Sequence, residues 1–213
     1  MDWPAWAPLY RAIAQDFGYS EGADREAALE LDRLLHGKAL ARDRDLRKLL
    51  EDKVVVVAGP ALARPLPPGD ALISCDSALE ALPPASHPDV LVTDLDGAVE
   101  RQVKANACCA LAVIHAHGDN LPALRRWVPS FAGRMVGTCQ TEPVGALRNF
   151  GGFTDGDRAV FLAAHAGAAK VVLAGFDFDR PVPKDGRDPA IKARKLAWAR
   201  KLIAEAGVPV EMA

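Results

Sequence analysis

Short runs of apolar residues recur along the chain from residue 54 onward. The runs are continuous rather than alternating, which is typical of strands that are covered on both faces. Helix-compatible stretches lie between several of them, for example residues 97–107 and 158–167, and a last helix is expected at residues 189–206. This alternation predicts an α/β fold, a mostly parallel sheet flanked by helices. We expect strands at residues 54–58, 71–75, 89–93, 111–115, 134–138 and 170–174.

The first 52 residues follow a different pattern and contain no good strand. Apolar residues recur at helical spacing in residues 3–17, in residues 24–35 and around Leu46. Asp24 is a plausible N-cap for the second of these helices. We therefore expect an N-terminal helical cap that packs on the rest of the chain. The predicted division is a helical segment at residues 1–52 and an α/β domain at residues 53–213.

Composition narrows the possible functions. The chain has 213 residues, with 26 Lys and Arg against 28 Asp and Glu, so its formal net charge is −2. A general nucleic-acid binder needs a basic excess or stripe, so we expect no nucleic-acid partner. No apolar run approaches the roughly 20 residues of a membrane span, and the N-terminus lacks the features of a signal peptide. We therefore expect a cytoplasmic protein with no membrane partner.

Acidic residues follow most of the predicted strands. The carboxyl ends of parallel strands share one edge of the sheet, and open α/β folds bind their ligands at that edge. Residues two apart on extended backbone point the same way, so Asp94 and Asp96 are expected to face one site together. The acidic residues expected at this edge are Asp76, Asp94, Asp96, Asp119, Asp177 and Asp179.

Clustered carboxylates repel one another, and the repulsion grows in a partly desolvated cleft. A bound cation removes this cost. An all-oxygen ligand set suits Mg²⁺, which takes one or two carboxylates and shares its other positions with water and phosphates. We therefore predict a magnesium site at Asp94 and Asp96. The alternative is that each acid only caps the helix that follows its strand.

A glycine-rich stretch, GGFTDGDRAV, has the features of a helix N-terminus. Free backbone N–H groups make such an N-terminus an anion site, and Arg158 is placed to reach a phosphate. Thr154 or Asp155 could instead serve only as a helix cap. The turn at Gly59 and Pro60, after the first strand, is a weaker candidate for the same role. The chain has no G-x-x-x-x-G-K-[ST] motif, which excludes a P-loop kinase.

Zinc-dependent hydrolysis is a rival chemistry. His115 and His117 form an H-x-H pair at a strand end, a spacing that can ligate zinc. The other histidines have no supporting spacing, and no serine lies in a G-x-S-x-G elbow that would indicate a catalytic triad. Cysteines in or beside apolar stretches are usually small buried residues. We expect this of Cys75, Cys108, Cys109 and Cys139.

Five segments together carry a resemblance to a known family. In chain order they are VVVVAGPAL (54–62), PDVLVTDLDG (88–97), HAHGDN (115–120), GFTDGDRA (152–159) and LAGFDFD (173–179). The combination resembles the archaeal 6-hydroxymethyl-7,8-dihydropterin pyrophosphokinase family, the MptE-like group, over most of the chain. Two segments are also similar to motifs of thiamin pyrophosphokinases, which implies a thiamin pyrophosphokinase-like catalytic domain. The family usually has a serine where this chain has Ala61, so no hydroxyl contact is expected there.

The resemblance implies transfer of diphosphate from ATP to the pterin hydroxymethyl group, with release of AMP. Asp94 and Asp96 would hold Mg²⁺, with Asp76 and Asp155 as further ligands, direct or through water. Asp119 is a candidate metal ligand or base. Together, Asp94, Asp96, Asp119 and Asp155 are the predicted catalytic residues. The residues expected near the ATP phosphates are Gly59, Pro60, Thr154, Asp155, Arg158 and Lys184.

The reduced pterin is expected beside the phosphates. Its amino-pyrimidinone edge can pair with a carboxylate, and Phe153 or Phe176 could stack on its ring. A basic C-terminal segment could close over the triphosphate as a lid, although a solvated helix face is the alternative. Its basic residues are Lys184, Arg187, Lys192, Arg194 and Lys195. The residues expected to contact the pterin are His115, His117, Asn120, Phe153 and Asp177.

Three other functions stay open at this point. The first is a transferase related to the same superfamily, against which the compact length of the chain speaks. The other two are closer to the main prediction. One is a thiamin-type pyrophosphokinase, which differs only in its acceptor. The other is a catalytically silent nucleotide- or pterin-binding module. The acidic set speaks against that module, because a pure binder gains little from clustered carboxylates that need a metal. A homodimer is implied by the resemblance alone.

Overall fold

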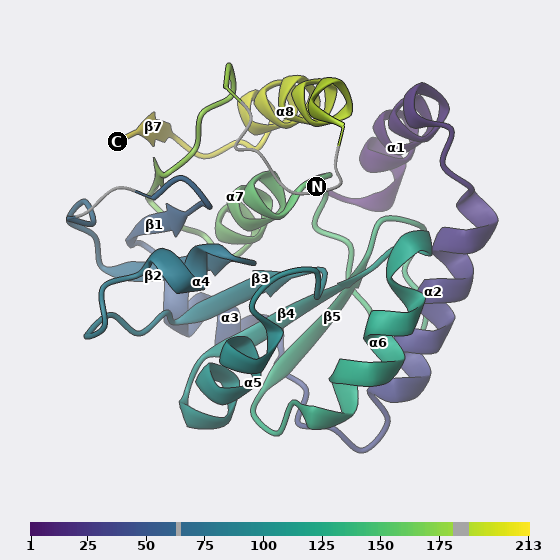
Figure 1. Ribbon diagram of the computed structural model, residues 1–213, viewed down its shortest axis with the longest axis horizontal. Coiled ribbons are helices and arrows are strands. Elements are labelled where there is room, and N and C mark those ends of the chain that lie inside the picture. Colours follow the sequence, from purple (N-terminus) through teal and green to yellow (C-terminus); the bar gives the residue numbers. More distant parts are fainter. Residues whose placement is uncertain (63–64, 181–187) are drawn as a thin grey trace.

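The computed structural model describes residues 1–62, 65–180 and 188–213, and this part of the chain is built on one seven-stranded sheet. Every neighbouring pair of strands is parallel, in the order β5-β4-β3-β2-β1-β6-β7 (Figure 1). The predicted α/β architecture is therefore confirmed. The strands are β1 (Val54–Ala58), β2 (Ala71–Cys75), β3 (Val90–Thr93), β4 (Leu111–Ala116), β5 (Met135–Cys139), β6 (Lys170–Ala174) and β7 (Val210–Met212).

The seventh strand, β7, is the element that the sequence does not predict. Its three residues are Val, Glu and Met, and none of them is fully buried. It pairs with β6 through Val171 and Val210 at one edge of the sheet. An edge strand of three residues buries little surface. For this reason β7 lacks the apolar run that marks most of the longer strands.

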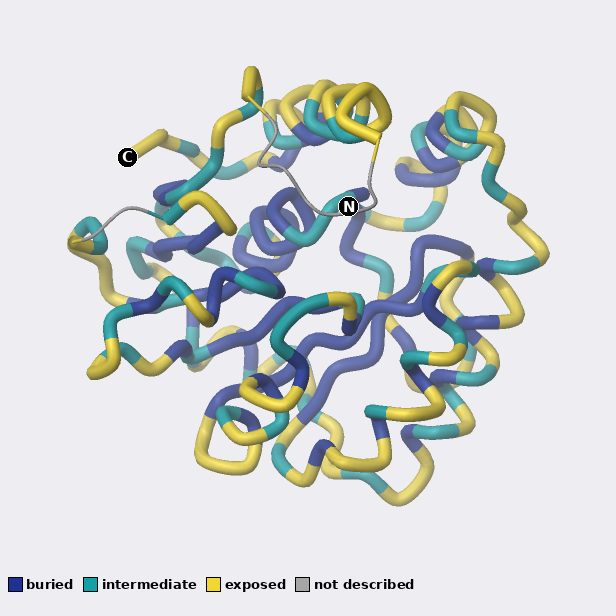
Figure 2. Tube along the Cα trace, viewed as in Figure 1, coloured by how far each residue is buried: buried dark blue, intermediate teal, exposed yellow. Residues whose placement is uncertain are grey.

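Helices cover both faces of the sheet, because successive strand residues point alternately into two apolar cores. One face packs against α1, α3, α7 and α8, and the other packs against α2, α4, α5 and α6. Figure 2 shows the strands as a buried centre and the outer helix surfaces as exposed. The helices are α1 (Trp3–Phe17), α2 (Glu21–Leu34), α3 (Asp43–Leu50), α4 (Ala78–Ala81), α5 (Val99–Cys108), α6 (Leu121–Trp127), α7 (Asp155–His165) and α8 (Pro189–Ala204).

The N-terminal helical segment packs on both faces of the sheet. Trp6 and Tyr10 of α1 enter the core on one face, and Leu31 of α2 enters the core on the other. The prediction that Asp24 caps the second helix is wrong. Ser20 is the N-cap, and its Oγ accepts a hydrogen bond from the N–H of Ala23 at 3.3 Å. Asp24 lies in the first turn, where it is 3% exposed.

Two further features of the described residues bear on the sequence predictions. No helix in the described ranges combines the length and the apolar character that a membrane crossing requires. Cys75 and Cys139 are buried as expected, whereas Cys108 and Cys109 are exposed. The expectation for this adjacent pair is wrong, because it lies at the end of α5, beyond the residues that pack on the sheet.

Candidate active site

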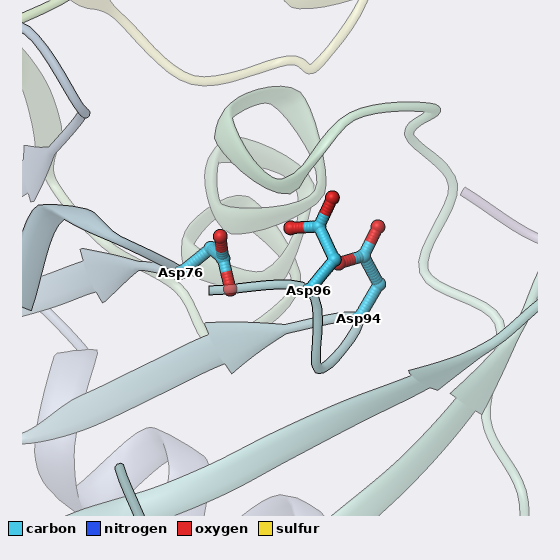
Figure 3. Close-up of side chains that lie close together, drawn as sticks. All are labelled: Asp76, Asp94 and Asp96. Atoms are coloured by element: carbon cyan, nitrogen blue, oxygen red, sulfur yellow. The ribbon is translucent and has the colours of Figure 1, made fainter. Parts of the chain in front are cut away.

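Three carboxylates meet at the carboxyl edge of the sheet. Asp76 directly follows β2, and Asp94 and Asp96 follow β3. One oxygen atom from each of them lies within 4.8 Å of the others. Figure 3 shows the three side chains side by side, carried by two neighbouring turns. Asp76 is buried, Asp94 is partly buried and Asp96 is exposed, so the carboxylate cluster opens to solvent on the Asp96 side.

The turn after β3 has a backbone conformation that side chains rarely adopt. Leu95 has a φ of +67°, in the left-handed region. Thr93 stabilises the turn, because its Oγ1 accepts a hydrogen bond from the Leu95 N–H at 2.9 Å and donates one to Asp76 Oδ1 at 3.3 Å. The Leu95 side chain is buried in the apolar core. This turn therefore presents Asp94 and Asp96 together beside Asp76.

The Asp76 carboxylate is fixed from two further sides. Gln102 of α5 donates from Nε2 to Asp76 Oδ1 at 3.2 Å. Gly97 lies against the same carboxylate, and a Cβ added there would stand 2.3 Å from Asp76 Oδ2. Any side chain at position 97 would have to displace the carboxylate. Gly97, which follows Asp94 and Asp96, therefore leaves the space that the Asp76 carboxylate occupies.

Asp94 is oriented by the turn that follows β4, the 3₁₀-helix η1 (Gly118–Asn120) and the residue before it. His117 Nε2 lies 3.4 Å from Asp94 Oδ2. The Asp119 N–H donates to His117 Nδ1 at 3.3 Å, so the ring proton lies on Nε2 and faces the carboxylate. Burial opposes ionisation of Asp94. The hydrogen bond from His117 and the positive charge of Arg158 outweigh burial and lower the pKa of Asp94 below its usual range.

Asp155, the first residue of α7, lies close enough to the carboxylate cluster for their charges to interact. Its Oδ1 accepts a hydrogen bond from Arg158 Nη1 at 3.1 Å. Burial raises its pKa well above the ordinary value, and the negative charges of Asp94, Asp76 and Asp96 raise it further. If the charges of these three carboxylates were neutralised, their contribution to the raised pKa of Asp155 would disappear.

The acids fit a divalent cation that prefers oxygen ligands. Asp94 Oδ1 is buried and has no hydrogen-bond partner in the described part of the chain. An unsatisfied carboxylate oxygen in a buried position is costly, and a metal ion would satisfy it. The same ion would relieve the repulsion that raises the pKa of Asp155. The chemistry of the donor set therefore matches Mg²⁺.

The helix N-terminus that the sequence marks as an anion site is present at the start of α7. Thr154 is the N-cap. The Asp157 carboxylate accepts from the N–H groups of Phe153 at 2.5 Å and Thr154 at 2.8 Å, and the Thr154 hydroxyl also donates to it. These groups are therefore engaged within the protein, which gives Thr154 a capping role. Arg158, which also contacts Asp155, is the stronger candidate for a phosphate contact.

His115 lies behind the carboxylate cluster. It is 2% exposed, and its Nδ1 is 3.0 Å from Thr138 Oγ1. Its Nε2 and the Nε of Arg158 have no hydrogen-bond partner among the described residues, and both side chains line a cavity of about 10 Å³. That volume holds at most one water molecule. Burial, followed by the charge of Arg158, lowers the pKa of His115 well below its usual value.

Two residues predicted to contact the pterin have clear structural roles. Asn120 is buried, and its Nδ2 donates to the carbonyl oxygens of Asp94 and His115, both at 2.8 Å. Phe153 is buried and packs against Phe17 of α1, with ring centroids 5.2 Å apart. These contacts hold α1, the β4 turn and the start of α7 in place. The residues predicted to bind the pterin therefore do not converge on one pocket.

Asp177 lines a larger hollow beyond the carboxyl end of β6, with a volume of about 640 Å³. The rings of Phe176 and Phe178 line it, with centroids 6.3 Å apart and planes at 15°. Phe176 also packs on the backbone of Gly59 and Gly156, so it stands between this hollow and the start of α7. The other lining residues are Leu173, Asp179, Arg200, Ile203, Ala204, Val208, Val210 and Met212.

The remaining predicted site residues lie outside the carboxylate cluster. The Gly59–Pro60 turn follows β1, and a Cβ on Gly59 would stand 2.6 Å from the Gly175 carbonyl oxygen, so the turns after β1 and β6 pack backbone to backbone. The Asp119 side chain is exposed, and its backbone N–H contacts His117. Lys184 and Arg187 lie outside the described residues.

Sequence reasoning missed two residues that hold Asp76. Thr93 reads as the last residue of an apolar strand, and nothing in the sequence marks its hydroxyl as a link between the two turns. Gln102 did carry a signal. It lies on the buried stripe of α5 between Val99 and Asn106, and a polar residue at a core position needs a hydrogen-bond partner.

Comparison with known proteins identifies the family. A family model described as "6-hydroxymethylpterin diphosphokinase MptE-like" matches residues 38–182. Three curated archaeal proteins, each named 6-hydroxymethyl-7,8-dihydropterin pyrophosphokinase, are similar to 95% of this chain. They are 43% identical in Methanothermobacter thermautotrophicus, 42% in Pyrococcus furiosus and 34% in Methanocaldococcus jannaschii, with 94%, 89% and 95% of their own lengths covered. The chain therefore belongs to the MptE-like family of 6-hydroxymethylpterin diphosphokinases.

Proposed function

We propose that this protein is a 6-hydroxymethyl-7,8-dihydropterin diphosphokinase that uses ATP and Mg²⁺. The observation that carries the proposal is the carboxylate cluster of Asp76, Asp94 and Asp96, which lies at the ligand-binding edge of the sheet in a member of this family. The names of the three archaeal relatives support the acceptor. The pathway that it would serve is the synthesis of a reduced pterin of the tetrahydromethanopterin or folate type.

The proposed reaction transfers the β- and γ-phosphates of ATP as one unit. The oxygen of the pterin hydroxymethyl group forms a bond to the β-phosphorus, the bond from that phosphorus to the α,β-bridging oxygen breaks, and AMP leaves. The hydroxyl proton is released to a base. Catalysis of such a step depends mainly on positioning and on neutralising phosphate charge.

The residues that would hold Mg²⁺ are Asp94 and Asp96, with Asp76 and Asp155 as further ligands, direct or through water. When bound, the ion would neutralise charge on the phosphates and on the leaving AMP oxygen. The protein supplies the orientation of these ligands. Thr93 and Gln102 hold the Asp76 carboxylate, and His117 holds that of Asp94. Arg158, hydrogen-bonded to Asp155, would add a positive charge facing the phosphates.

The acceptor would occupy the hollow beside β6. Its volume of about 640 Å³ falls within the range of small-molecule pockets. Phe176 and Phe178 offer aromatic faces to a planar ring, and Asp177 offers a carboxylate to the amino-pyrimidinone edge. Asp177 already accepts hydrogen bonds from the backbone N–H groups of Asp179 and Arg180 through Oδ1, both at 2.9 Å, which fixes its orientation.

An acceptor panel tests the proposed function. The protein is incubated with ATP, Mg²⁺ and either 6-hydroxymethyl-7,8-dihydropterin or thiamine, and the products are separated by chromatography. We expect one AMP for each pterin diphosphate and no thiamine product. Turnover with thiamine alone would move the protein to the thiamin-type alternative. ADP as product would mean that a single phosphoryl group is transferred.

Two companion observations complete this test. Binding of ATP or pterin without any nucleotide consumption would favour the silent binding module. Activity that survives excess EDTA would contradict the role of Mg²⁺. The homodimer implied by family resemblance is a separate proposal, which light scattering on the purified protein decides.

A further inference from the structure

We infer that Asp24, in the N-terminal helical segment, is a positioning residue of the carboxylate cluster. It acts through the turn after β4, which carries the His117 ring against Asp94. The sequence predicts that Asp24 is a helix cap, and the proposed function gives it no role. The predicted effect of Asp24 on catalysis rests on the proposed function, whereas its predicted effect on the position of the His117 ring does not.

Asp24 is a buried carboxylate with three hydrogen-bond donors around it. Its Oδ2 accepts from the Tyr10 hydroxyl and from Gln140 Nε2, both at 2.8 Å. Its Oδ1 accepts from the backbone N–H of Gly118, also at 2.8 Å. All three donors are neutral groups, and a buried charge is tolerated only when such bonds satisfy it. The position in the first turn of α2 adds a favourable helix dipole.

The three donors come from three separate parts of the fold. Tyr10 belongs to α1, Gln140 follows β5, and Gly118 begins η1 after β4. The Gln140 carbonyl also accepts a hydrogen bond from the Trp6 indole N–H of α1, at 2.9 Å. Asp24 therefore ties the N-terminal helices to two of the loops at the ligand-binding edge of the sheet.

The η1 turn sits directly on the start of α2. A Cβ added to Gly118 would stand 2.8 Å from the Ala23 Cβ, which leaves no space between the turn and the helix. His117 is the next residue back along the chain. Its Nε2 faces Asp94 Oδ2 at 3.4 Å, and its backbone N–H donates to Asn120 Oδ1 at 3.1 Å. The hydrogen bond from Gly118 to Asp24 thus fixes the backbone from which His117 reaches Asp94.

The central test compares Asp24→Ala with Asp24→Asn. Alanine removes the acceptor for Gly118. Asparagine keeps an oxygen toward Gly118, while the Tyr10 hydroxyl rotates and the Gln140 amide flips to accept from its new NH₂ group. We expect Asp24→Ala to lower kcat about 10- to 100-fold, the range for residues that orient metal ligands, with little change in the Michaelis constant for the pterin. We expect Asp24→Asn to restore most of that loss.

A matched control separates positioning from stability. Tyr10→Phe removes one hydrogen bond from the same buried group and leaves the bond to Gly118 intact. It is expected to lower the melting temperature and to retain wild-type kcat. If Tyr10→Phe lowers kcat as far as Asp24→Ala does, the role of Asp24 is general stability and the inference is wrong.

A spectroscopic readout is independent of activity. The ring ¹⁵N shifts of His117 report which nitrogen carries the proton, and a His117→Gln spectrum assigns them. We expect the Nε2–H tautomer in the wild type, Tyr10→Phe and Asp24→Asn, and a mixture in Asp24→Ala. A wild-type pattern in Asp24→Ala would overturn the inference even if the protein proved to have no pterin diphosphokinase activity.

A second variant covers the case in which Asp24→Ala does not fold. Gly118→Ala pushes the turn away from α2 without removing the buried acid. It should produce the same mixture of His117 tautomers and a comparable loss of kcat. Wild-type values for both in Gly118→Ala would also overturn the inference.

Discussion

The carboxylate cluster and the hollow beside β6, both at the carboxyl edge of the sheet, are built in opposite ways. Around Asp76 and Asp94, the side chains are largely buried, and hydrogen bonds from Thr93, Gln102 and His117 fix them. Beside β6, the walls are apolar side chains and two aromatic rings, and the acids Asp177 and Asp179 are exposed. Polar contacts therefore fix the side chains of the carboxylate cluster, whereas the shape of the apolar walls defines the hollow beside β6.

This difference matches two separate demands of diphosphoryl transfer. Handling phosphate charge requires ligands whose positions are set before the substrates arrive, because reorganisation during the reaction would raise the barrier. Recognition of a flat acceptor requires a surface and a few polar groups. Small displacements should therefore be far more harmful at the carboxylate cluster than in the hollow beside β6.

The largest effect is expected from Asp94→Asn. The change keeps the shape and an acceptor for His117, but removes the charge that would hold Mg²⁺. We expect kcat to fall by about 10²–10³-fold, the loss typical of removing one group that stabilises developing charge. The melting temperature of the metal-free protein should also fall at neutral pH, because the contacts with His117 and Arg158 that lower the pKa of Asp94 stabilise its ionised form in the folded state. Steady-state kinetics and thermal unfolding measure both quantities.

A charge-matched control accompanies this prediction. Glu100→Gln removes an exposed acid from the first turn of α5, outside the carboxylate cluster. Its kcat should stay close to the wild-type value. Equal losses in Glu100→Gln and Asp94→Asn would mean that overall charge, rather than the cluster, controls activity.

Gly97→Ala tests whether a small displacement is enough to disturb the cluster. The new Cβ would need the space of Asp76 Oδ2, which lies 2.3 Å from its ideal position. We expect kcat to fall about 10- to 100-fold, as for other changes that misorient a metal ligand. Gly22→Ala is the control, because its Cβ would meet only Ser20 Oγ at 3.6 Å. That variant should keep full activity, and a similar loss in both would contradict the steric explanation.

Asp177→Asn tests the hollow beside β6. The carboxamide of asparagine has no negative charge, so it pairs less well than a carboxylate with the amino-pyrimidinone edge of a pterin. We therefore expect the Michaelis constant for the pterin to rise. The rise should be about 10-fold, which corresponds to one charge-assisted hydrogen bond. The Michaelis constant for ATP and kcat should change little. A selective rise in the ATP constant would show that the hollow binds the nucleotide.

The smallest effect is a change in stability at Asp155. Because its pKa is raised in the folded protein, the folded state binds this proton more tightly than the unfolded chain does. Stability therefore falls as pH rises between the unfolded-state pKa, about 4, and the raised folded-state pKa. Asp155→Asn should raise the melting temperature of the metal-free protein at pH 7 by roughly 2–4 °C for each kcal/mol gained. The gain should shrink toward pH 4, and a gain that grows on acidification would contradict this sign.

The sequence predicted the sheet well, because most of its strands are short, largely apolar runs separated by helix-compatible stretches. It also predicted that acids after β2 and β3 would meet, since the carboxyl ends of parallel strands share one edge. The left-handed turn at Leu95 and the link through Thr93 could not be predicted, because each depends on contacts between strands.

Contacts between segments that are distant in the sequence also account for the misplaced N-cap and for the scattered acceptor residues. Asp24 has the residue type of a cap, but three donors distant in sequence draw it into the interior. His115 and Asn120 lie at the correct strand end, yet their side chains turn toward the protein rather than toward a ligand. Strand order predicts which edge a residue occupies, and packing decides which way it points.

The most direct test of the carboxylate cluster is a calorimetric titration with α,β-methylene ATP, whose α–β linkage cannot be cleaved. The wild type and Asp94→Asn are each titrated with and without Mg²⁺. We predict that Mg²⁺ tightens binding to the wild type at least about 10-fold, equivalent to 1.4 kcal/mol, and has little effect on Asp94→Asn. Equal affinity of the wild type for the analogue with Mg²⁺ and with EDTA would contradict the proposal that these carboxylates hold the metal for diphosphoryl transfer.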